Sequence, residues 1–162
     1  MKPLHTFQEF LNESLNESSN TAIDFSDKST ALALPTKLPA KYRKDIKVSV
    51  YNAPAVQVAH GARVNNLPQP SRTFRWDKLI ETSRNSDEWI ALTAVAVVED
   101  TANRVTFFTV YEEFDPIDLN DLKSNRDLYA EDTYKDETDL IKKMQAWFSK
   151  AEKLLKEIKA DY

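Results

Sequence analysis

The feature that most constrains the fold is the apolar stretch over residues 88–114, EWIALTAVAVVEDTANRVTFFTVYEEF. It holds two runs rich in valine, threonine and aromatic residues, which favour β-strands. Residues 100–103, Asp-Thr-Ala-Asn, separate the two runs and are typical of a turn. Neighbouring positions are apolar in both runs, so we expect both faces to be buried. The stretch therefore predicts a hairpin at the centre of an antiparallel sheet.

A long helix is predicted at the C-terminal end of the chain. Its apolar residues recur with helical spacing and form one stripe: Leu140, Met144, Trp147, Phe148, Ala151, Leu154, Leu155 and Ile158. Lysines fill the opposite side, and acidic residues at 136–139 suit the helix dipole. The predicted fold class is α+β: an antiparallel sheet centred on the 88–114 hairpin, covered by this helix, with a flexible N-terminal tail.

The remaining elements are expected to be short. Ile46, Val48 and Val50 alternate with polar residues, which predicts a strand, and residues 55–59 predict a second one. Residues 64–71 contain two prolines and predict a loop. Residues 76–84 have helical spacing, although RTFRW just ahead reads equally well as an edge strand. A short helix is expected near 119–128.

The chain divides into three parts by composition. Residues 1–17 form an amphipathic leader, and residues 18–45 are predicted to be a linker with little regular structure, because polar residues and then Pro35 and Pro39 dominate there. Residues 46–162 are expected to form a single α+β domain.

Composition excludes several classes of function. The chain has no cysteine, which rules out disulfides and thiol chemistry, and its single glycine, Gly61, rules out a glycine-rich phosphate loop. No apolar run approaches the ~20 residues that span a bilayer, so no membrane association is expected. No cofactor is predicted.

Candidate catalytic and metal groups are sparse. His5 and His60 stand apart, without metal-ligand spacing. Residues 115–126 resemble a calcium loop in their acidic spacing but lack its glycine and its closing glutamate. Glu112 and Glu113 alternate across a strand and so cannot both face one substrate. We expect no catalytic centre and no metal site.

Charge is unevenly distributed along the chain. Residues 18–74 are mainly basic and residues 75–162 mainly acidic, although the whole chain carries only −4. A charged face of this kind can steer a partner. The candidate partner surface is the acidic set Glu112, Glu113, Asp115, Asp118 and Asp121.

Residues 72–76, Arg-Thr-Phe-Arg-Trp, interleave basic and aromatic groups, as single-stranded nucleic-acid sites do. The alternative interpretation places Phe74 and Trp76 in the core, with the arginines in solvent. We expect the second, because the domain is not basic overall. Nucleic acid is thus not expected as a partner.

The leader carries a short amphipathic helix and a repeat. The apolar residues that share one face of the expected helix, over about 6–15, are Leu4, Phe7, Phe10, Leu11 and Leu15. Such a face can dock on a partner. Directly behind it the tetrapeptide Leu-Asn-Glu-Ser occurs twice in succession, at 11–14 and 15–18.

The leader resembles the capsid-targeting sequence of the internal head proteins of T-even-type tailed phages. In that family a lysine-bearing start precedes Thr, an aromatic residue, Gln-Glu-Phe, an aliphatic residue, any residue and Glu, as in TFQEFLNE here. The prohead protease of those phages cuts after a glutamate that follows an aliphatic residue by two positions and precedes a small residue. The resemblance implies tandem cleavage at Glu13–Ser14 and Glu17–Ser18.

The expected function follows from this resemblance. We expect an internal head protein of a virion, whose partners are the prohead protease and the capsid scaffold, and whose domain passes to the host cytoplasm with the DNA. There the domain is expected to inhibit or bind an unidentified host protein without catalysis. The alternative is a non-virion acidic binding module, or an inhibitor that mimics nucleic-acid charge; an enzyme is least expected.

Overall fold

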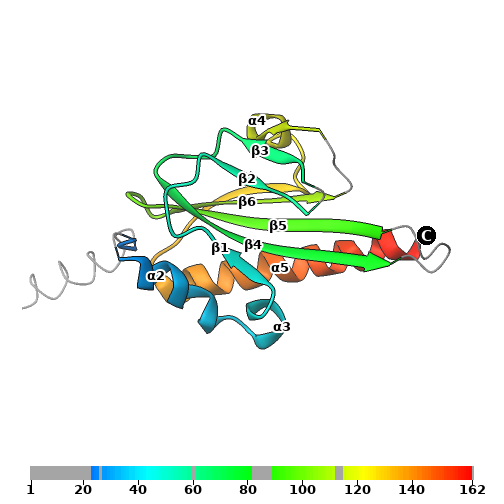
Figure 1. Ribbon diagram of the computed structural model, residues 1–162. Coiled ribbons are helices and arrows are strands. Elements are labelled where there is room, and N and C mark those ends of the chain that lie inside the picture. Colours follow the sequence, from blue (N-terminus) through cyan, green and yellow to red (C-terminus); the bar gives the residue numbers. More distant parts are fainter. Residues whose placement is uncertain (1–22, 26, 60, 82–88, 112–114, 162) are drawn as a thin grey trace, which may run out of the picture.

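The computed structural model describes residues 23–25, 27–59, 61–81, 89–111 and 115–161. It confirms the α+β fold class. Five strands form one antiparallel sheet in the order β1-β4-β5-β6-β8, and the long helix α5 (Glu137–Ala160) covers one face of it (Figure 1). The strands are β1 (Ile46–Val48), β4 (Ser71–Glu81), β5 (Trp89–Glu99), β6 (Arg104–Tyr111) and β8 (Tyr129–Thr133).

The predicted hairpin is the centre of this sheet. β5 and β6 pair from Leu92 opposite Tyr111 to Val98 opposite Val105, and β5 also pairs along its whole length with β4. The side chains of β5 from Ile90 to Val98 are all buried, because alternate residues face α5 and the opposite layer. Burial on both faces explains why apolar and polar residues do not alternate along this strand.

A second, small sheet covers the face that α5 leaves open. It consists of β2 (Ala55–Gln57), β3 (Arg63–Asn65) and β7 (Ile117–Asp118), followed by the single-turn helix α4 (Leu119–Leu122). Val56, Val58 and Val64 pack from this layer onto Val95 and Phe108 of the large sheet. The molecule is therefore a three-layer stack of helix, large sheet and small sheet (Figure 1).

The prediction of a structureless linker over 18–45 is wrong for its described residues. They form α2 (Lys28–Ala33), the 3-10 turn η1 (Leu34–Lys37) and α3 (Ala40–Arg43), here called the N-terminal strap. The strap and Phe25 just ahead of it bury six side chains: Phe25, Ala31, Leu34, Pro35, Leu38 and Tyr42. All of these except Pro35 belong to the core cluster beside α5 and the sheet. The packed domain therefore reaches back at least to Ile23, whose side chain lies against the same core, and not only to Ile46.

The two prolines that suggested a linker begin turns in the strap. Pro35 occupies the first turn of η1, and Pro39 is the N-cap of α3. Both positions suit proline, because the first backbone N–H groups of a helix have no partner within the helix. Ion pairs then join the strap to α5, between Lys37 and Glu137 and between Lys41 and Glu152.

Two further predictions fail. Residues 76–81 continue strand β4 instead of forming a helix, and the helix expected over 119–128 ends at Leu122. The sequence then forms β8, an edge strand that pairs with β6 from Arg104 opposite Thr133 to Phe108 opposite Tyr129. Among the described helices, none is long and apolar enough to span a bilayer.

Candidate interaction surfaces

The acidic surface is only partly described, because Glu112 and Glu113 lie outside the described residues. Asp115, Asp118 and Asp121 lie close together in the chain, just before β7, at its end and in α4. Asp118 serves the fold as well: its carboxylate caps α4 by accepting from the Asn120 N–H at 2.9 Å, and it accepts from Asn66 at 2.8 Å. Asp115 and Asp121 are exposed.

Strand β8 extends the acidic character to one edge of the large sheet. Glu131 and Asp132 are exposed there, and the Tyr129 hydroxyl donates to Glu131. Burial of Tyr129, together with the neighbouring Glu131, raises the pKa of its phenol above its usual range, so the hydroxyl stays protonated and keeps donating. Charges on an edge strand also oppose pairing with another chain.

Residues 72, 74 and 76 of β4 face α5 and the N-terminal strap, whereas Arg75 lies on the other face. Phe74 and Trp76 are buried under α5. The Trp76 ring lies edge-on to the Tyr42 ring there, with 5.6 Å between the two ring centroids. Arg72 forms an ion pair with Asp100 at 2.7 Å. Core packing is thus confirmed for both aromatic rings, and neither is available to stack on bases. The expectation that the arginines lie in solvent is wrong, because the side chains of Arg72 and Arg75 are only 11% and 19% exposed.

A polar cluster on the other face of β4 joins the two sheets. The Asp77 carboxylate lies 3.1 Å from Arg75 Nε and 3.3 Å from Lys47 Nζ, and it accepts from the Thr93 hydroxyl at 2.9 Å. Thr93 in turn accepts from the Ala59 N–H at 2.8 Å, and Arg75 donates through Nη1 to the Gln57 carbonyl. Side chains of the large sheet therefore hold two backbone groups of the other layer, one in β2 and one just after it.

Two adjoining hollows lie beside this cluster, with volumes of about 290 and 230 Å³, and they share Lys47, Gln57 and Arg75. We call their common surface the β1–β2 groove. Its walls are Lys47, Val48 and Ser49 on one side and Ala55, Val56 and Gln57 on the other, and its floor includes Thr73, Arg75, Asp77 and Leu79. The sequence does not predict this groove, because the spacing of residues 76–84 indicates a helix for the segment that holds Asp77 and Leu79.

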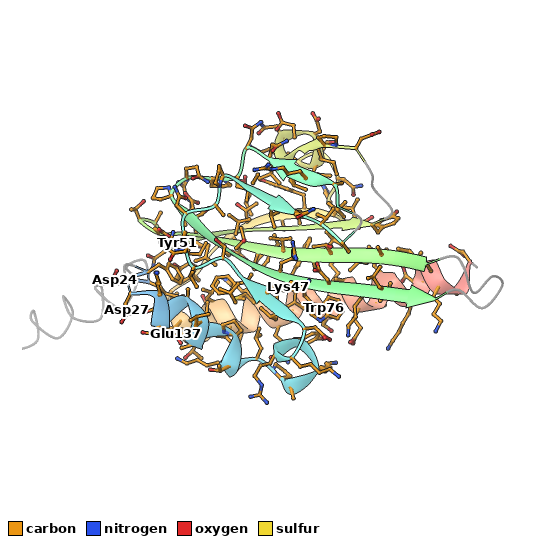
Figure 2. The ribbon with its side chains drawn as sticks, in the orientation of Figure 1. Asp24, Asp27, Lys47, Tyr51, Trp76 and Glu137 are labelled. Atoms are coloured by element: carbon orange, nitrogen blue, oxygen red, sulfur yellow. The ribbon has the colours of Figure 1, made fainter. Side chains whose placement is uncertain are left out.

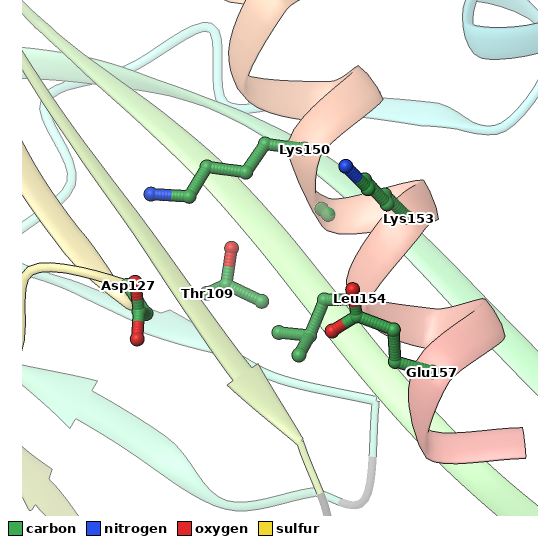
Figure 3. Close-up of a pocket in the computed structure, with 7 residues that line it drawn as sticks. Thr109, Asp127, Lys150, Lys153, Leu154 and Glu157 are labelled. Carbon is green, nitrogen blue, oxygen red and sulfur yellow. The ribbon is translucent and has the colours of Figure 1, made fainter. Parts of the chain in front are cut away.

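A separate hollow of about 300 Å³ lies between α5 and the end of β6 (Figure 3). Lys150, Lys153 and Glu157 come from α5, and Asp127 from the chain ahead of β8. Lys150 already donates to the Arg126 carbonyl at 3.2 Å. Figure 3 shows Thr109 and Leu154 between the charged groups, so the hollow is lined by charges of both signs.

The other sequence candidates have different outcomes. The leader face Leu4, Phe7, Phe10, Leu11 and Leu15, both cleavage sites (Glu13–Ser14 and Glu17–Ser18), and the histidines His5 and His60 lie outside the described residues. Within the described residues, no group of three or more histidine, aspartate or glutamate side chains is arranged to hold a metal ion.

Comparison of the chain with family models, curated proteins and solved structures finds no match.

Proposed function

We propose that this chain is an internal head protein of a tailed phage, carried in the virion by residues 1–17 and then released as a binding domain. The observation that carries the proposal is the leader: TFQEFLNE fits the capsid-targeting pattern, and the Leu-Asn-Glu-Ser repeat supplies two successive sites for the prohead protease. The apolar face of the leader docks on the capsid scaffold, and the polar residues behind it enter the protease in an extended form.

The position of the packed domain supports separate roles for the leader and the domain. Phe25 is the first buried side chain among the described residues, and the second proposed cut, after Glu17, lies upstream of it. Cleavage at either site therefore removes none of the core that the structure describes. We therefore expect the domain to stay folded when the leader is removed.

The domain is proposed to bind or inhibit a host protein after delivery. Support comes from its charged surfaces, since one edge of the large sheet is acidic at Glu131 and Asp132, and the opposite side carries Lys47 and Arg75. Charge separation of this kind favours oriented docking on a charged partner. The alternative, a charge-mimicking inhibitor outside any virion, uses the same acidic surface without the leader.

A transplanted leader tests the packaging step. Residues 1–17 are fused to a fluorescent protein and expressed during phage infection, and fluorescence is counted per purified particle. The proposal expects fluorescent heads, and expects the Phe10→Asp variant to reduce the signal because it places a charge on the docking face. Equal signals from the two fusions, or none from either, would contradict the packaging role.

A further inference from the structure

The β1–β2 groove lies between two strands that each form an outer edge of their sheet. β1 is the outermost strand of the five-stranded sheet, and β2 is the outermost strand of the three-stranded sheet. The loop between them leaves residues 47–49 and 55–57 as opposite walls of one hollow. An extended chain segment has the width to occupy such a space, because strands in a sheet lie about 5 Å apart.

The backbone of β1 has one side with which no described strand pairs. Ser49 N–H donates to the Thr73 carbonyl at 3.0 Å, and Lys47 lies opposite Arg75 in the β1–β4 pair. In an antiparallel ladder, alternate residues direct their N–H and C=O groups to the same neighbour. Because Lys47 and Ser49 point theirs toward β4, Ile46 and Val48 point theirs away from it, toward the open edge.

The side chains around this edge are mainly cationic. Lys47 is 65% exposed, and Arg75 stands beside it in the floor. Arg63 is paired with Gln57 across the small sheet, and both side chains are exposed. Asp77 is the one carboxylate among the described lining residues, and it already contacts Lys47 and Arg75. The groove therefore has a positive balance.

Two exposed apolar side chains stand at opposite ends of the same edge. Tyr51 follows β1 and is 62% exposed, and Leu79 lies further along β4 and is 56% exposed. Figure 2 shows Lys47 on β1 and Tyr51 near α2, where Lys28 Nζ lies 4.4 Å from the centroid of the Tyr51 ring. Large exposed apolar groups next to charged ones are typical of protein contact surfaces.

We propose that the β1–β2 groove receives an extended acidic segment of a partner protein, which pairs as an added strand with the open edge of β1. Carboxylates of the segment contact Lys47 and Arg63, and its apolar residues contact Tyr51 and Leu79. This inference refines the binder role proposed above and is independent of the leader. It favours a peptide over a nucleic-acid strand, because Phe74 and Trp76 are buried and the edge offers hydrogen bonds of strand type.

The test uses labelled octapeptides of alternating valine and glutamate, blocked at both ends, and the full-length chain. Binding is followed by fluorescence anisotropy. Two further probes carry N-methyl groups, one on all its valines and the other on all its glutamates. Strand pairing uses the N–H groups on only one side of a peptide. We therefore expect saturable binding below about 1 mM, a loss of about tenfold or more for one methylated probe, and little change for the other.

Matched protein variants separate the groove from general charge. Lys47→Glu should weaken binding by about tenfold. Lys142→Glu makes the same charge change on the exposed side of α5 and should change binding less than about twofold. Absence of binding at 1 mM, equal losses in the two variants, equal effects of both methylations, or tighter binding of a ten-nucleotide oligothymidine would each overturn the proposal. None of these results bears on the leader, so the packaging role stands or falls separately.

Discussion

Phe148 lies where helix α5, the large sheet and the N-terminal strap meet. Its side chain is fully buried, and its ring lies 5.9 Å from Tyr42 of the strap and 6.3 Å from Trp76 of β4. Three elements that are distant in the sequence are thus joined by one aromatic cluster. Offset and tilted ring pairs of this kind add to the stability gained from burial alone.

We expect Phe148→Ala to lower the free energy of unfolding by about 3–5 kcal/mol, because it removes a buried ring and leaves a cavity that rigid neighbours cannot fill. Urea unfolding followed by tryptophan fluorescence measures the change. Ser149→Ala, at an exposed position of the same helix, is the control and should change stability by less than ~0.5 kcal/mol. A loss below about 1 kcal/mol for Phe148→Ala would show that the cluster is not tightly packed.

Asp139 gives stability a dependence on pH. Its carboxylate accepts from the Lys135 N–H at 2.9 Å, and Lys143 Nζ lies 3.4 Å away. The Lys135 hydrogen bond, and then Lys143, hold the pKa of this carboxyl below its ordinary 3.8. A lowered folded pKa stabilises the protein above the unfolded value, and this gain is lost as pH falls through the folded pKa.

We therefore expect the wild type to be more stable than Asp139→Asn at neutral pH and the two to converge in acid. Urea unfolding at a series of pH values between about 6 and 2 measures both curves. Curves that stay parallel over the whole range would mean that the carboxylate charge contributes nothing.

At the scale of elements, α5 depends on its first turn. Asp136 is the N-cap, and its side chain accepts from the Asp139 N–H at 2.8 Å. We expect Asp136→Ala to cost about 0.5–2 kcal/mol, because one N–H of the first turn loses its partner, and Asp136→Ser to recover most of that loss. Thermal unfolding of the three proteins provides the comparison. If the serine variant were no better than alanine, the cap would not be the cause.

The strong periodicities predicted the elements that bury the most surface. The hairpin of β5 and β6 and the helix α5 were predicted because the spacing of their apolar residues fits only one type of secondary structure in each case. The helix expected over 76–84 was wrong because Trp76, Leu79 and Ile80 fit a helical spacing, whereas pairing with β5 along all of β4 decides for a strand. Tertiary contact overrode local pattern.

Weak patterns were the ones that failed. The strap was missed because Pro35 and Pro39 suggested a break where each begins a turn. β8 was missed because YAEDT is acidic, as suits an edge strand but not a buried one. The small sheet and the β1–β2 groove depend on pairings of two or three residues, which carry little periodic signal in one sequence.

At the scale of the whole molecule, ion pairs within the fold neutralise part of the charge asymmetry between the two halves of the chain. Basic residues of the strap and of β4 face acidic residues from the second half of the chain, as in the pairs Lys37–Glu137, Lys41–Glu152 and Arg72–Asp100. The two more exposed pairs, Lys37–Glu137 and Lys41–Glu152, contribute little each to stability. They nonetheless leave less free charge for a partner than the sequence suggests.

The boundary of the domain follows from the strap. A chain that begins at Ser18 should melt within a few degrees of the full chain, because the buried side chains described here start at Phe25. A chain that begins at Ile46 loses six buried side chains, including Phe25, Leu34, Leu38 and Tyr42. Burial of each large side chain stabilises a domain by about 1.5–3 kcal/mol. The summed loss is therefore comparable to the whole free energy of unfolding of a domain, ~5–15 kcal/mol. We expect no cooperative unfolding transition for it in calorimetry.

The central claim is that residues 1–17 are a removable virion address on a domain that folds without them. The most direct measurement is the N-terminus of the protein recovered from purified phage heads, read by mass spectrometry. The account predicts a chain that begins at Ser14 or Ser18, a chain that begins only at Ser18 for Glu13→Gln, and an intact leader only when Glu17→Gln is added, because each substitution removes the charge that the protease reads. Wild-type protein that is absent from heads, or present there with Met1 intact, would contradict the account.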